Sequence, residues 1–172
     1  MTDARFQDGP FWSVPSKGFS SWGNRFFIDT EFTDFDAPQL ISLAIVGESG
    51  SEFYGECTDY DTASCSDFVR AVVLPQLGQF RARAMPFEQL RQVAQTWIAG
   101  IPTTSKPVLC YDYETDLNLL RILLDGSLPD GWALESIRGQ LDVRRRAAYF
   151  ARHGGEHHAL HDARANAYAS IA

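Results

Sequence analysis

The sequence predicts an α/β fold with a mixed β-sheet, antiparallel over its first three strands and then parallel, flanked by helices. A strand-forming stretch at residues 25–32 is followed by two more strands, which the turn sequence Gly47-Glu48-Ser49-Gly50 joins as a hairpin. Short apolar runs then alternate with segments whose apolar residues recur at helical spacing. The chain has 172 residues, enough for one core, so we expect a single domain over residues 25–172.

The amino-acid composition indicates which broad class of protein this is. The chain is 45% hydrophobic and 13% aromatic, which is typical of a globular domain. Its net charge of -7 repels nucleic acid, so any such contact must be local or depend on metal ions. The three cysteines lack Cys-x-x-Cys spacing and indicate buried thiols in a reducing compartment. No apolar run has transmembrane length and no leader sequence is recognisable, so we expect a cytoplasmic protein without membrane contact.

The N-terminal half supplies the antiparallel part of the sheet. Residues 1–24 are rich in turn residues and aromatic side chains, which predicts an irregular extension packed on the domain or on a partner. The predicted strands span residues 25–32, 39–46 and 52–56. The predicted helices run from a Ser66 N-cap to Pro75 and from Phe87 to Gly100. We assign their apolar side chains, Phe68 and Val93 included, to the core.

The C-terminal half alternates strands and helices. The predicted elements are a strand at 106–111, a helix from a Thr115 N-cap to Gly126, a strand near 132–137, a helix from Arg144 to Arg152, and an alanine-rich helix from His158 to the end. A basic run such as Arg144-Arg145-Arg146 usually forms a solvated face, but this one precedes the segment that contains all four histidines.

Two carboxylates stand at the end of the first strand. Asp29 and Glu31 are two residues apart, and side chains at i and i+2 of a strand point to the same face. Each charge opposes the ionisation of the other, and a divalent cation would remove that repulsion. The alternative is that both acids are solvated where the strand ends.

A second acidic position begins the helix that follows the fourth strand. Asp116 lies just after the Thr115 cap, where an acid also stabilises the helix dipole by ~0.3–1 kcal/mol without any catalytic role. Asp112, at the end of the preceding strand, is a rival candidate for the functional role.

The histidines cluster near the C-terminus. His157 and His161 have the i, i+4 spacing of zinc ligands, but His158 stands where the zinc-protease pattern requires Glu. The other interpretation pairs His157 with Asp162. On one helix they would be ~140° apart, so they converge only if His157 lies on a loop before the helix. Gly154-Gly155 supplies such a loop.

These motifs together resemble those of the DEDDh branch of the DnaQ-like 3′-5′ exonucleases, which have an RNase H-like fold. The resemblance rests on Asp29-Thr30-Glu31, Asp116-Leu117-Asn118-Leu119-Leu120 and His157-His158-Ala159-Leu160-His161-Asp162-Ala163, in that order, and covers residues 25–172. Asp29–Phe32 and the segment 69–77 are most similar to the small RNase AS-type exoribonucleases. Two departures are Asp112, where relatives often carry Asn, and the N-terminal extension.

The resemblance implies a 3′-5′ exoribonuclease that hydrolyses single-stranded RNA, including 3′ tails, to nucleoside monophosphates. It also implies two Mg²⁺ ions, replaceable by Mn²⁺, and a homodimer. The roles it implies are Asp29 bridging both ions, Glu31 and Asp162 on the nucleophile side, Asp116 on the second ion, and His157 as general base. Phe32 and Phe35, just past the first motif, are candidates to stack on the terminal base, with ordinary core packing as the alternative, and Thr30 is assigned to the substrate with them.

Two other functions use the same features. A DNA-directed 3′-5′ exonuclease would carry the same site. A non-catalytic nucleic-acid-binding module would use the fold alone, but it would have no need of four acids and a histidine at these positions.

Overall fold

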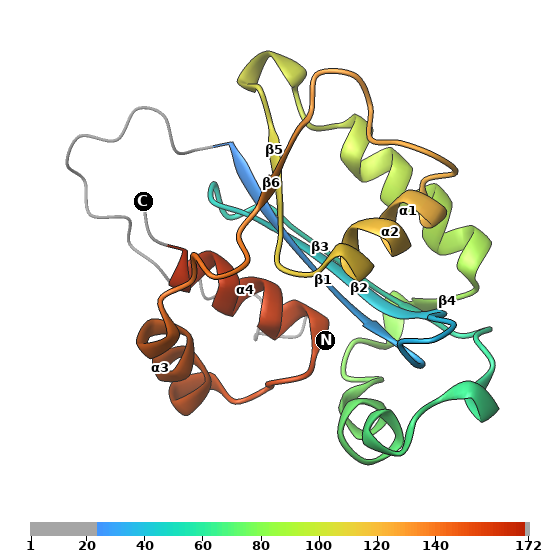
Figure 1. Cartoon of the computed structure of the whole chain (residues 1–172). Coiled ribbons are helices and arrows are strands. Elements are labelled where there is room, and N and C mark those ends of the chain that lie inside the picture. The colour runs from blue at the N-terminus through green and yellow to red at the C-terminus, as the bar shows by residue number, and fades with distance from the viewer. Residues whose placement is uncertain (1–23, 171–172) are drawn as a thin grey trace, which may run out of the picture.

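The computed structural model of the protein describes residues 24–170. The predicted N-terminal extension lies outside this range, apart from Asn24. The described residues form a six-stranded sheet in the order β4-β3-β2-β1-β5-β6 (Figure 1). The strands are β1 (Arg25–Phe32), β2 (Leu40–Gly47), β3 (Glu52–Cys57), β4 (Ala84–Met85), β5 (Val108–Tyr111) and β6 (Ala133–Ser136).

The pairing of the strands confirms the predicted α/β fold, and the sheet is consistent with an RNase H-like architecture. β1, β2 and β3 pair antiparallel, whereas β5 runs parallel to β1 and β6 parallel to β5. The sequence did not predict β4, a two-residue strand parallel to β3, because so short a strand has no periodicity.

Helices cover both faces of the sheet (Figure 1). α1 (Phe87–Ala99) and α2 (Glu114–Leu123) pack on one face, and α4 (Ala159–Ala169) packs on the other with α3 (Val143–His153) beside it. Within residues 24–170, every helix is too short or too polar to cross a bilayer.

The alternation of side chains along β1 decides which face carries its acids. Phe26 and Ile28 belong to the core under α1 and α2, whereas Phe27 packs on the opposite face with Cys110 and Ile137. Asp29 and Glu31 share the parity of Phe27 and therefore face α4. The parallel strands β1 and β5 end at the same edge of the sheet, which is where open α/β folds bind ligands.

Residues 66–77 depart from the prediction of one regular helix. The Ser66 hydroxyl accepts the Val69 N–H at 3.2 Å, as an N-cap does, but a π-helix (Val69–Val73) and a 3₁₀ turn (Leu74–Gln76) follow. Pro75 does not end the segment, because it lies in the first turn of the 3₁₀ helix, where its missing N–H needs no partner.

Two side chains assigned to the core from periodicity are in fact exposed. Phe68 is 52% exposed and Val93 37% exposed, so both assignments were wrong. Helical periodicity identifies a face but cannot show how far the neighbouring elements extend over it. The three cysteines are buried and free.

Candidate active site

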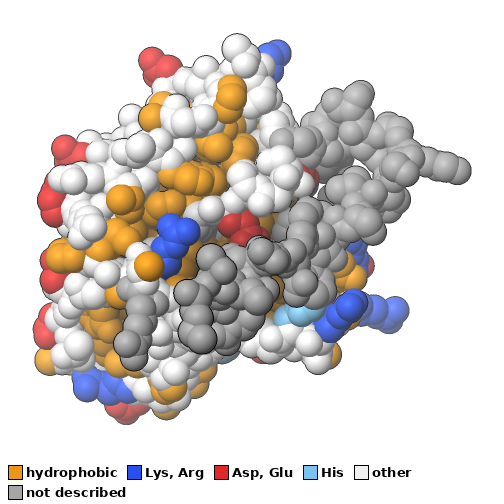
Figure 2. All heavy atoms as spheres, turned by 180° about the vertical axis from the view of Figure 1, so that it is seen from behind, with side chains coloured by type: hydrophobic (Ala, Val, Ile, Leu, Met, Phe, Trp, Pro, Cys, Tyr) orange, Lys and Arg blue, Asp and Glu red, His pale blue; other side chains and the backbone are white. Residues whose placement is uncertain are grey.

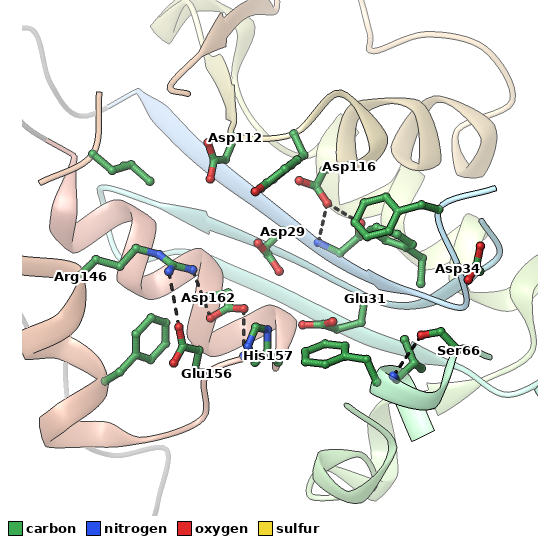
Figure 3. Close-up of a pocket in the computed structure, with 18 of the residues that line it drawn as sticks. Asp29, Glu31, Asp34, Ser66, Asp112, Asp116, Arg146, Glu156, His157 and Asp162 are labelled. Atoms are coloured by element: carbon green, nitrogen blue, oxygen red, sulfur yellow. Dashed lines mark hydrogen bonds and ion pairs between the residues drawn. The ribbon is translucent and has the colours of Figure 1, made fainter. Parts of the chain in front are cut away.

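Three carboxylates from two distant parts of the chain meet beside the sheet. Asp29 and Glu31 come from β1, and Asp162 comes from the first turn of α4. One carboxylate oxygen of each lies within 4.8 Å of the other two. Figure 3 shows the three side chains around one space, with the His157 ring beside them.

The packing of α4 explains why Asp162 reaches this place. The first turns of the helix press small and apolar side chains against β2 and β3, and the contacting residues are Ala44, Val46, Tyr54, Ala159, Leu160 and Ala163. Small residues allow the helix to approach the sheet closely, so the short Asp162 side chain extends to the end of β1.

Burial and mutual repulsion both oppose ionisation of the cluster. Burial, and then the charges of Asp162 and Asp116, raise the pKa of Glu31 to about 8. Burial and the neighbouring acids also raise the pKa of Asp29 well above its ordinary value. Burial raises the pKa of Asp162 to about 7, although Arg146 opposes the shift. Without a cation, these acids therefore retain protons near neutral pH.

The donor set fits a hard divalent cation. Mg²⁺ and Mn²⁺ prefer oxygen ligands, and a cation would reverse the repulsion that keeps these carboxylates protonated. Among the described residues, this is the only group of three ligand-type side chains that converges so closely, and no histidine belongs to it. The structure therefore gives no support to the zinc interpretation of His157 and His161.

Asp116 approaches the cluster from the opposite face of the sheet. Its Oδ1 accepts hydrogen bonds from the Thr30 hydroxyl at 2.6 Å and the Thr30 N–H at 3.2 Å. Burial raises its pKa to about 6, although the bonds from Thr30 oppose this. Asp116 is 3% exposed and lies outside the three-carboxylate group, but its charge raises the pKa of both Asp29 and Glu31.

The structure also bears on two neighbours of Asp116: Asp112, the rival candidate for its role, and Thr115, the predicted N-cap of its helix. Asp112 lines the same pocket from the end of β5 but is not among the residues that converge on Asp29. The predicted N-cap was wrong: α2 begins at Glu114 and its N-cap is Tyr113, without a side-chain hydrogen bond. Asp116 remains in the first turn, because the helix starts only two residues earlier than predicted.

His157 lies on the loop between α3 and α4. α3 ends at His153 and the N-cap of α4 is His158, so the loop contains Gly154, Gly155 and His157. The His157 N–H donates to Asp162 Oδ2 at 3.1 Å, and its ring meets Phe68 edge to face with centroids 4.9 Å apart.

The two neighbouring histidines point elsewhere. His158 is 1% exposed and stacks on Tyr54, whose hydroxyl lies 3.2 Å from its Nε2. His161 packs against His158 and Tyr149. Of these three histidines, only His157 lines the pocket that contains the carboxylates.

Sequence reasoning missed Arg146, which is not part of a solvated face. Its guanidinium lies 3.7 Å from Asp162 and 3.8 Å from Glu156, and it donates to Asn166 at 3.1 Å. It is the only Lys or Arg that lines the pocket within the described residues. A signal existed in the sequence: Arg146 is one helical turn from Phe150, so one face of α3 combines a cation with an aromatic ring.

The pocket has a volume of about 930 Å³ and an aromatic wall. Phe35 is 73% exposed and meets the half-buried Phe32 edge to face, with centroids 5.0 Å apart. Phe68 and Tyr113 add two exposed rings, which the sequence did not assign to the site. Thr30 lines the pocket but is only 5% exposed, and its hydroxyl donates a hydrogen bond to Asp116.

Comparison with known proteins gives a partial match. No protein-family model matches the chain. A segment of 54 residues is 43% identical to proteins of two Mycobacterium tuberculosis strains, CDC 1551 / Oshkosh and ATCC 25618 / H37Rv, each described as a 3′-5′ exoribonuclease. The matched segment covers 31% of this chain and 32% of each relative, so the chain matches about a third of the length of these curated proteins.

Proposed function

We propose that this protein is a metal-dependent 3′-5′ exoribonuclease of the DEDDh type. The observation that carries the proposal is the convergence of Asp29, Glu31 and Asp162 within 4.8 Å, in a pocket that His157 also lines. The partial similarity to two proteins described as 3′-5′ exoribonucleases supports the same assignment.

Each residue of the site would have a separate role in phosphodiester hydrolysis. Asp29, Glu31 and Asp162 would hold a divalent cation, and Asp116, fixed by Thr30, would serve a second. Bound divalent cations supply Lewis acidity toward the attacking water and the departing 3′ oxygen. His157 would accept the proton of the attacking water, for which an imidazole at the pocket wall is suited.

The pocket favours the end of a single strand as substrate. The exposed rings of Phe35, Phe68 and Tyr113 offer surfaces on which unpaired bases can stack. On the face shown in Figure 2, the Lys and Arg side chains of the described residues lie in separate small groups. Among the described residues, Arg146 is the only Lys or Arg that lines the pocket. A duplex requires a longer basic track along its backbones, so we propose single-stranded RNA as substrate.

The substrate assignment is tested with 5′-labelled single-stranded RNA and DNA of equal sequence in Mg²⁺. We expect RNA to shorten from its 3′ end with release of nucleoside monophosphates, and a 3′-phosphate to stall the reaction. Faster digestion of DNA would replace the RNA assignment by a DNA-directed exonuclease. Cutting of a circular single strand would show an endonuclease instead.

A further inference from the structure

The backbone of His157 is held in a conformation that a histidine rarely adopts by itself. Its φ is 65°, in the left-handed region, which is sterically unfavourable for a residue with a Cβ. Such a conformation persists only where neighbours impose it. Asp162 holds the N–H of His157, and Gln76 holds its carbonyl group.

Gln76 binds the loop at two consecutive peptide groups. Its side-chain nitrogen lies 2.8 Å from the carbonyl oxygen of Glu156, 3.2 Å from that of His157 and 3.1 Å from that of Val72. All three partners are acceptors, so only the NH₂ group of the amide can serve them. The two N–H groups are therefore shared among three carbonyl oxygens, one in the 66–77 segment itself and two in the loop, so the amide connects this segment to the loop that carries His157.

The segment that carries Gln76 is itself anchored at both ends. On one side, Val69 and Val73 pack with Ile41 and Cys65 in a small buried cluster. On the other side, the Gly78 N–H donates to both carboxylate oxygens of Glu56, at 3.0 and 3.1 Å. Glu56 lies in β3 and is 4% exposed, so Gln76 projects from a support fixed to the sheet.

The loop is only partly restrained upstream of His157. Gly154 and Gly155 both have positive φ, of 65° and 78°, which glycine adopts at low cost. The Gly154 N–H donates to the Phe150 carbonyl at 2.8 Å, but a Cβ at Gly154 would meet nothing within 4 Å, whereas one at Gly155 would lie 2.5 Å from the His161 ring. Packing therefore confines Gly155 but not Gly154, and contacts downstream of the glycines contribute to the conformation that turns His157 toward the pocket.

We propose that Gln76 is a positioning residue for His157. Its amide fixes the 154–158 loop, and Phe68 of the same segment packs against the imidazole ring, so the segment 66–77 determines where the general base lies. The catalytic consequence rests on the proposed function, whereas the structural claim, that Gln76 orders the loop, stands by itself.

The test replaces Gln76 with methionine, which keeps the length of the side chain and removes both donors. The matched control is Gln79→Met, because the Gln79 amide donates to the carbonyl of Gln76 at 2.9 Å, within its own segment. Hydrogen exchange of the amides of residues 156–158 is measured in both variants, together with kcat and KM on single-stranded RNA.

We expect Gln76→Met to speed amide exchange in the loop while the exchange of the β2 amides is unchanged. It should lower kcat on the order of 10²-fold with little change in KM, because a misplaced base affects the chemical step more than binding. In a His157→Ala background the same substitution should cause no further loss of rate. Gln79→Met should match the wild type throughout.

Unchanged loop exchange in Gln76→Met would overturn the proposal, as would an undiminished rate loss in the His157→Ala background. These outcomes are separate from failure of the proposed function. A wild-type protein without nuclease activity would refute the function, and the exchange measurement would still decide whether Gln76 orders the loop.

Discussion

The N–H of His157 donates a 3.1 Å hydrogen bond to Oδ2 of Asp162, although five residues separate them. On one continuous helix these side chains would lie ~140° apart. They meet because His157 precedes the N-cap of α4 and Asp162 lies in its first turn. The loop that presents the proposed general base is thus bonded to a proposed metal ligand.

Replacing His157 with alanine should slow hydrolysis by about 10²–10⁴-fold, the usual contribution of a general base. Calorimetric Mn²⁺ affinity should change little, because the three carboxylates remain and Asp162 still accepts the N–H of residue 157. The control is His161→Ala, since His161 packs against Tyr149 and His158. An equal loss of rate in the control would place the base elsewhere.

Glycine at position 157 should separate backbone strain from chemistry. His157→Gly and His157→Ala both remove the imidazole, so their rates should be equally low. Glycine tolerates the φ of 65°, whereas alanine does not, so His157→Gly should be more stable by about 1 kcal/mol. Urea unfolding of the two variants provides the comparison, and equal stabilities would mean that the loop conformation carries no strain.

Replacing Asp116 and Asp112 separately with asparagine should show which of the two acids serves the metal site. Asp116→Asn keeps an oxygen that accepts from Thr30 but removes the charge beside Asp29, and turnover should fall roughly 10–100-fold. Asp112→Asn should have a much smaller effect, because Asp112 is not among the acids that shift the pKa of Asp29 or Glu31. A larger loss at Asp112 would reverse the assignment.

The metal-free protein should lose stability as the pH rises from 6.5 to about 8. In this window Glu31, whose pKa is raised from 4.5 to about 8, and Asp162, whose pKa is raised to about 7, bind protons when folded but not when unfolded. The free energy of unfolding therefore falls with pH. Burial lowers the pKa of His158 from 6.5 to about 4, which has the opposite effect, but only below this window.

Urea unfolding at several pH values, in chelator and in saturating Mn²⁺, measures this slope. The cation should flatten it, because the carboxylates are then ionised in the folded state as well. A metal-free stability that stays level or rises across the window would show that the cluster is not protonated in the folded protein.

The sequence predicted the sheet well, because its signals are local. β1 matched its predicted bounds, and β2 and β3 lay within one residue of theirs, since buried strands and a glycine-rich turn are recognisable in short windows. The i, i+2 spacing of Asp29 and Glu31 likewise required them to share a face.

Other features depended on contacts between distant segments. The two loop carbonyl groups that Gln76 binds belong to Glu156 and His157, 80 and 81 positions away, and no local pattern indicates such bonds. The basic run obscured Arg146: its spacing from Phe150 was a weak signal, and the contact with Asp162 that sets it apart depends on the packing of α3 beside α4. Phe68 was assigned to the core for the same reason: periodicity does not reveal that the wall of a pocket begins there.

Asp29 is the residue at which the proposed metal-dependent hydrolysis can be examined with a single substitution. The measurement is nucleotide release from single-stranded RNA by the wild type and by Asp29→Asn, with Mg²⁺ and in excess EDTA, together with urea unfolding of both in EDTA. We expect release only by the wild type with Mg²⁺. The variant should be at least as stable as the wild type, because asparagine cannot ionise, whereas the buried Asp29 among three other acids must bind a proton to avoid their repulsion. Full activity of the wild type in excess EDTA, or of Asp29→Asn in Mg²⁺, would contradict the account.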